Sequence, residues 1–212
     1  MKKNHWYAVK GQSLAIYARS AGFDLADYGG YSNSVQTELK KRAIKEALHE
    51  IAVACYEQGL EVATIKDGVY VISLSNPLSI QYQTRRSQVI YIGIGNIMGR
   101  IESHFNKSLF DFMQSLSGAN FDFYFACPAL KGPAKSYYKH VEYRMLEYFS
   151  EQYGGVDKVR RFPILNMKAG SNKKFSGGTD WWKKPLKASG KRPLWELKPT
   201  AFSDFAALDD DE

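Results

Sequence analysis

The chain has 212 residues, of which 44% are hydrophobic and 24% are charged, and its formal net charge is +7. This composition is typical of a globular protein with ample core material, and it excludes a chain that stays unfolded for lack of apolar residues. No segment approaches the roughly 20 apolar residues that a membrane span requires, and the start lacks a stretch of signal-peptide length. We therefore expect a cytoplasmic protein without a membrane partner, whose positive charge favours a polyanion such as nucleic acid.

The charge is distributed unevenly along the chain. Residues 156–200 carry a net charge of +9, whereas residues 204–212 contain five acids and no base. Together with the hydrophobic patterns described next, this asymmetry predicts three regions. They are a helical N-terminal extension (residues 1–66), a compact domain (67–168) and a Trp- and Lys-rich basic arm with an acidic end (169–212).

The N-terminal region contains one clear element. Residues 1–32 show no decisive pattern, but apolar residues recur every four positions after Asn33 and predict a helix that ends at Gln58. Its basic residues either contact a phosphate backbone or form a solvated face; they are Lys40, Lys41, Arg42 and Lys45. Cys55 and Cys127 each sit in an apolar run, which favours buried free thiols over a disulfide or a metal site.

The compact domain alternates β-branched runs with helical periodicities. Asn76-Pro77 opens a loop that ends near Arg86, and Gly154-Gly155 ends the last helix. The predicted elements are strands over residues 68–74, 88–93 and 121–127, helices over about 97–116 and 134–153, and a short extended segment over 162–166.

Two tripeptides in this domain carry the strongest functional signal. Gly68-Val69-Tyr70 and Tyr91-Ile92-Gly93 each lie on a predicted strand, and Arg100 and His104 share one face of the helix that follows. This arrangement resembles the GIY-YIG nuclease superfamily. The resemblance covers about 100 residues, and it implies an α/β (α+β) domain with a small three-stranded antiparallel sheet flanked by helices.

The family order of Tyr, Tyr, Arg, His, Glu and Asn is filled here in sequence. The resemblance implies Tyr70, Tyr91, Arg100, His104, Glu142 and Asn166 as catalytic residues. For the acid, Glu142 is preferred over Glu147, because only Glu142 leads an apolar helix face. Glu142 is then the metal ligand, for Mg²⁺ or Mn²⁺.

The chemistry of phosphodiester hydrolysis explains this set of residue types. A lone carboxylate holds a hydrated Mg²⁺ against the phosphate, and the planar guanidinium of Arg100 fits phosphate oxygens bidentately. By resemblance, Tyr70 helps to deprotonate the attacking water, while Tyr91 and His104 orient or relay that proton. Asn166 braces the site by hydrogen bonding. A packed surface histidine is the alternative for His104.

One position departs from the family pattern. Several members carry a lysine soon after the YIG glycine, whereas Ile94 follows Gly93 here. The departure shifts more of the task onto Arg100 and His104. The sequence therefore predicts a metal-dependent endonuclease acting on DNA, with RNA as the other possible substrate. The alternatives are a nucleic-acid-binding module without catalysis, and a protein that binds a partner through its acidic tail.

The basic arm is the second candidate for contact with nucleic acid. Its lysines suit phosphate contacts and its tryptophans suit stacking on bases or sugars. The candidate residues are Lys168, Lys173, Lys174, Trp181, Trp182, Lys183 and Lys184. The alternative is that the tryptophans pack back onto the domain and the lysines are solvated.

Overall fold

The computed structural model describes residues 2–129, 136–154, 162–166, 179–187 and 195–197. Its main sheet has four strands in the order β1-β6-β2-β5, and all neighbouring strands are antiparallel. The predicted strands are present as β2 (Gly68–Leu74), β5 (Val89–Gly95) and β6 (Phe121–Ala126). The mixed α+β class is confirmed, but the sheet has four strands rather than three.

The fourth strand comes from the N-terminal region, which was expected to be helical. Strand β1 (Trp6–Gln12) pairs with β6, and its register shifts between Val9 and Gln12. Gly11 lies within that shift with φ +70°, a conformation that glycine adopts without the steric cost of a Cβ. Because the alternation is broken there, the segment lacks the clean pattern of a strand.

Short helices follow β1 and lead into the long predicted helix. They are α1 (Leu14–Ser20) and the 3₁₀ helix η1 (Leu25–Gly30), and the long helix is α2 (Asn33–Tyr56). Helix α2 ends two residues before the predicted Gln58, and another 3₁₀ turn, η2 (Val62–Thr64), precedes β2. Of the α2 residues that recur at four-residue spacing, Ala43, Ala47, Ile51 and Cys55 are buried, as the periodicity predicts, and Leu39 is partly buried.

The predicted helix after β5 is continuous but changes its winding. It consists of α3 (Ile97–His104), the π-helical turn η3 (Phe105–Leu109) and α4 (Phe110–Ser115). Such π turns inside α-helices are often found at functional sites. The last long helix is α5 (Tyr137–Tyr153), and the predicted start near residue 134 lies outside the described residues.

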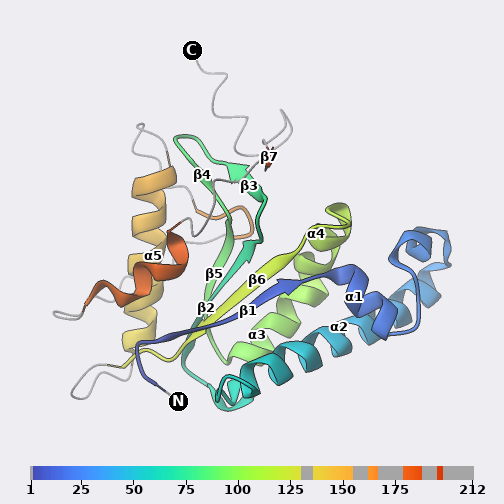
Figure 1. Ribbon diagram of the computed structural model, residues 1–212, viewed down its shortest axis with the longest axis horizontal. Helices are drawn as coiled ribbons and strands as arrows, with labels where there is room; N and C mark the ends of the chain where they lie inside the picture. The colour runs from blue at the N-terminus through green and yellow to red at the C-terminus, as the bar shows by residue number, and fades with distance from the viewer. Residues whose placement is uncertain (1, 130–135, 155–161, 167–178, 188–194, 198–212) are drawn as a thin grey trace.

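Helices cover both faces of the sheet (Figure 1). On one side α2, α3 and α4 pack on strand residues of the Tyr70 face, where the Phe105 and Phe123 rings lie 6.4 Å apart. On the other side lie α5 and the 3₁₀ helix η4 (Asp180–Leu186). Strand β2 is buried along its whole length, so the polar side chains that it carries, including Tyr70, lie within the core.

Two segments differ from their predicted conformations. The predicted loop after Asn76 contains strands β3 (Leu78–Gln81) and β4 (Arg86–Ser87), which form a second sheet with β7 (Trp195–Leu197). The predicted extended segment 162–166 contains a turn closed by a hydrogen bond from the Asn166 amide to the Pro163 carbonyl, 2.7 Å. Among the described residues, no helix is long and apolar enough to cross a membrane.

Candidate active site

The two glycines of the paired tripeptides are required by close packing. Gly93 lies opposite Tyr70 in the β2–β5 ladder. A Cβ atom at Gly93 would stand 2.5 Å from the Tyr70 hydroxyl and 2.5 Å from the Tyr91 ring. A Cβ at Gly68 would collide with the side chains of Ile97 and Ile65. Each glycine therefore opens the space that a functional tyrosine or the start of α3 occupies.

Two tyrosines and a histidine form the centre of the site. The Tyr70 hydroxyl and His104 Nε2 are hydrogen-bonded at 2.8 Å. The Tyr70 and Tyr91 rings are stacked with centroids 5.8 Å apart, and the Tyr91 and His104 centroids are 4.1 Å apart. These contacts place the half-buried His104 ring against both tyrosines, while its role stays a prediction.

Arg100 enters this cluster because α3 begins in a defined way. Asn96 caps the helix by accepting a hydrogen bond from the Gly99 amide, and the Arg100 amide bonds to the Asn96 carbonyl at 2.9 Å. One turn later the helix presents His104 on the same face. The Arg100 side chain is exposed at this edge of the molecule, which leaves its guanidinium accessible to a phosphate.

Burial controls the proton affinities of the two tyrosines. It raises the pKa of Tyr70 well above its usual value, and the nearby Arg100 guanidinium partly offsets this effect. Burial also raises the pKa of Tyr91, with Arg100 again acting in the opposite direction. Both phenols are therefore protonated at neutral pH.

His104 is shifted towards its neutral form. Burial, and then the positive charges of Arg100 and Lys107, lower its pKa to about 4. At pH 7 one ring nitrogen of His104 therefore lacks a proton. A neutral imidazole can accept a proton from the phenol that it contacts. Its low pKa means that it would hold that proton only briefly.

Glu142 supplies the carboxylate of the site from helix α5. Burial raises its pKa to about 7, although the charges of Arg100 and Lys139 act to lower it. Within the described residues its carboxylate has no hydrogen bond or ion pair, and it is close enough to affect the pKa of Tyr91. Glu147, the alternative acid, instead forms an ion pair with Arg144 at 2.7 Å.

Asn166 braces the sheet next to Tyr91. Its side-chain amide donates to the Ile92 carbonyl at 2.8 Å and accepts from the Ile92 amide at 2.9 Å. The Leu165 amide also bonds to the Ile90 carbonyl at 3.0 Å. Asn166 thus pairs with the free edge of β5 as a short strand would, and it fixes the backbone on the C-terminal side of Tyr91.

Two residues near Glu142 were missed by the sequence analysis. Tyr138 lies one helical turn before Glu142, and burial together with the neighbouring Asp67 carboxylate raises the pKa of Tyr138. Asp67 directly precedes the Gly68-Val69-Tyr70 tripeptide. The four-residue spacing of Tyr138 and Glu142 was a usable signal, but nothing in the sequence linked Asp67 to helix α5.

The described part of the basic arm packs onto the domain. Trp182 is only 4% exposed and its ring lies 5.9 Å from that of Tyr148, so the prediction that it stacks on a base is wrong. Trp181 contacts the Trp6 ring, and Lys183 forms an ion pair with Asp180 at 2.6 Å, whereas Lys184 is exposed. Lys168, Lys173 and Lys174 lie outside the described residues.

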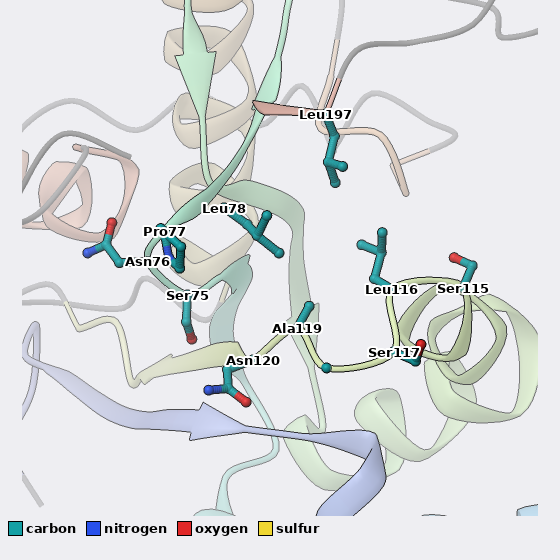
Figure 2. Close-up of a pocket in the computed structure, with 11 residues that line it drawn as sticks. Ser75, Asn76, Pro77, Leu78, Ser115, Leu116, Ser117, Ala119, Asn120 and Leu197 are labelled. Atoms are coloured by element: carbon teal, nitrogen blue, oxygen red, sulfur yellow. The ribbon is translucent and has the colours of Figure 1, made fainter. Parts of the chain in front are cut away.

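A separate hollow lies at the far end of β2. It has a volume of about 510 Å³ and is bounded by the loop after β2 and the loop between α4 and β6. Figure 2 shows Leu116 and Leu197 pointing towards each other across it, above Ser75 and Asn120. None of the six predicted catalytic residues lines this hollow, and no charged side chain does. Its walls therefore offer no group for phosphoryl chemistry.

Glu142 is the carboxylate of the site that a divalent cation would use as a ligand. Among the described residues there is no cluster of three or more His, Cys, Asp or Glu side chains. Glu142 is half-buried and has no cation in ion-pairing contact among the described residues, so a bound metal ion would compensate its charge. Comparisons of the chain with protein-family models, curated proteins and solved structures found no match.

Proposed function

We propose that this protein is a metal-dependent endonuclease of the GIY-YIG type, which hydrolyses phosphodiester bonds in DNA. The observation that carries the proposal is the gathering of polar side chains from four separate elements at one edge of the sheet. They are Tyr70 from β2, Tyr91 from β5, Arg100 and His104 from α3, and Glu142 from α5.

The hydrogen bond between Tyr70 and His104 suggests the path of the proton. With its ring proton on Nδ1, neutral His104 accepts the Tyr70 hydroxyl proton at Nε2 while Tyr70 accepts a proton from the attacking water. The hydroxide forms the new P–O bond, the bond to the leaving oxygen breaks, and that oxygen takes a proton from solvent. His104 then releases its added proton to solvent and returns to the neutral form. Tyr70 thus acts as a general base without first becoming a free phenolate, which its raised pKa disfavours.

The remaining side chains bind and orient the phosphate. Arg100 donates from a planar guanidinium to two phosphoryl oxygens and neutralises the charge that develops on them. Tyr91 is stacked on Tyr70 and holds the Tyr70 ring in place, and its own hydroxyl donates a hydrogen bond to the phosphate. Glu142 would hold the cation, which when bound stabilises negative charge on the phosphoryl and leaving oxygens.

The proposal is tested with the purified full chain and four labelled substrates. Duplex DNA, single-stranded DNA, duplex RNA and single-stranded RNA are each incubated with Mg²⁺, with Mn²⁺ and with EDTA. We expect cleavage of duplex DNA that depends on the cation and is absent in EDTA. Salt-dependent binding without cleavage of any substrate would favour the alternative of a non-catalytic nucleic-acid-binding module.

A further inference from the structure

A basic hollow lies on the opposite face of the sheet from Tyr70. It has a volume of about 510 Å³ and is lined by the start of the chain and by helix η4, and we name it the η4 hollow. Trp6 pairs with Ala126, as does Val69, so Trp6 points to the face opposite Tyr70. The residues that matter are His5, Trp6, Trp181, Lys183, Lys184 and Lys187.

The walls of the η4 hollow are fixed by packing and hydrogen bonds. The Trp6 indole donates to the Trp181 carbonyl at 3.2 Å, and the two rings lie 5.6 Å apart. Trp182 and Leu186 are buried, and the Tyr153 hydroxyl donates to the Leu186 carbonyl at 3.0 Å. The hollow is therefore a preformed surface of the domain.

Part of the positive charge in the η4 hollow has no acidic partner among the described residues. Lys183 pairs with Asp180, but Lys184 and Lys187 are exposed and form no ion pair within the described part of the chain. In the sequence, residues 167–178 and 188–194 on either side add five Lys or Arg and no acid. A run of positive charge of this length suits a polyanion better than a small anion.

Tryptophan at the hollow adds a second kind of contact. The Trp181 indole N–H is buried and has no acceptor among the described residues, which is uncommon for a donor in a packed wall. Lysines beside tryptophans are the combination that nucleic-acid-binding surfaces use for phosphates and for sugars or bases. Nothing comparable lines the uncharged hollow of Figure 2.

We propose that the η4 hollow binds the sugar-phosphate backbone of DNA outside the cleavage site, with Lys184 and Lys187 as the phosphate contacts. The inference rests on the proposed function in taking DNA as the ligand. Helix η4 packs on α5, which also carries Glu142 (Figure 1). A DNA strand bound in the hollow is therefore positioned relative to the Glu142 carboxylate by helix α5.

The test compares two double variants that each remove two positive charges. Lys184→Gln with Lys187→Gln changes the η4 hollow, and Lys10→Gln with Arg19→Gln changes two exposed basic residues of β1 and α1 that line neither site. Fluorescence anisotropy of a labelled 30-base-pair duplex is measured in EDTA across a salt series. Losing two phosphate contacts reduces the slope of log affinity against log salt by about 1.8, with roughly tenfold weaker binding at low salt.

The Lys10–Arg19 pair is expected to leave the slope within error of the unmodified chain. Equal effects of the two pairs would mean diffuse attraction and would overturn the proposed site, as would no effect of the η4 pair. Thermal unfolding confirms that both variants are folded. Cleavage in Mg²⁺ is measured separately. A chain that binds through Lys184 and Lys187 but never cuts would refute the nuclease and keep the η4 site. A chain that cuts but does not need these lysines for binding would keep the nuclease and refute the η4 site.

Discussion

The candidate active site and the η4 hollow both combine aromatic rings with cations, but they differ in how much water they exclude. At the active site the tyrosines, His104 and Glu142 are withdrawn from solvent, and burial shifts their pKa values in the direction of their neutral forms. At the η4 hollow the aromatic Trp6 is buried while Lys184 and Lys187 remain exposed.

This difference distinguishes two kinds of function. Proton transfer requires groups whose affinities are altered by desolvation and by neighbouring charges. Binding a polyanion requires only accessible charge in a fixed arrangement. The predictions below therefore disturb the buried site, where large effects on the rate of cleavage are expected from small chemical changes.

The largest effect is expected from Gly93→Ala. The added methyl group would stand 2.5 Å from both tyrosines, so their rings must move apart. We expect cleavage to fall to background and the free energy of unfolding to fall by about 1–3 kcal/mol. Gly29→Ala is the control, because no atom lies within 4 Å of its added Cβ. Normal cleavage by Gly93→Ala would show that the stacking of the tyrosines is irrelevant to the reaction.

Arg100→Ala should lower the cleavage rate by about 10²–10³-fold, because one preorganised donor group to the phosphoryl oxygens is lost. Arg100→Lys should recover little of that loss, since an ammonium does not bind two oxygens in one plane. Single-turnover rates at saturating duplex separate this effect from weaker binding. A fully active lysine variant would reduce the role of Arg100 to that of a diffuse positive charge.

Tyr70→Phe removes only the hydroxyl that bonds to His104, so the ring still packs against Tyr91. We expect cleavage to slow by about 10²-fold or more, with duplex affinity within about twofold of the unmodified protein. The matched control is Tyr17→Phe, whose buried hydroxyl donates to the Gln12 side-chain oxygen at 2.7 Å, away from the site. Equal rates for Tyr70→Phe and the unmodified chain would remove Tyr70 from the proton path.

The smallest effect concerns the pH dependence of stability. The folded-state pKa of Glu142 is about 7, above its usual value of 4.5, so ionisation disfavours the folded state. The penalty is complete above pH 7 and vanishes below about pH 4.5. Without metal, Glu142→Gln should therefore raise the free energy of unfolding at pH 8 by up to about 3 kcal/mol and leave it nearly unchanged at pH 4. A gain of the same size at both pH values would argue against a shifted carboxyl.

Much of the site was predictable because its signals are local. The paired tripeptides, the Arg–His spacing and the acid at the edge of an apolar helix face can each be seen within a few residues, and the structure brings them together. Strand β1 was missed because its alternation is interrupted at Gly11, and the β3–β4–β7 sheet because its strands are short and come from distant parts of the chain.

For the basic arm, the sequence predicted a function but missed the packing. Its lysines and tryptophans suggested contact with nucleic acid, yet Trp182, Pro185 and Leu186 fill a space beside α5 and β1 that only the folded domain creates. Composition describes what a segment favours alone, whereas its burial depends on complementary surfaces elsewhere. The pairing of Asn166 with the edge of β5 was likewise predicted as a brace, but its partner Ile92 was not.

The central claim is tested most directly by the single-turnover rate of duplex cleavage in Mg²⁺ for Glu142→Ala beside Glu147→Ala. Both variants lose a carboxylate from helix α5, but Glu147 is paired with Arg144 and only Glu142 is coupled electrostatically to Arg100 and Tyr91. We predict that Glu142→Ala binds duplex DNA and does not cut it, while Glu147→Ala cuts within about threefold of the unmodified protein. Normal cleavage by Glu142→Ala would contradict the account.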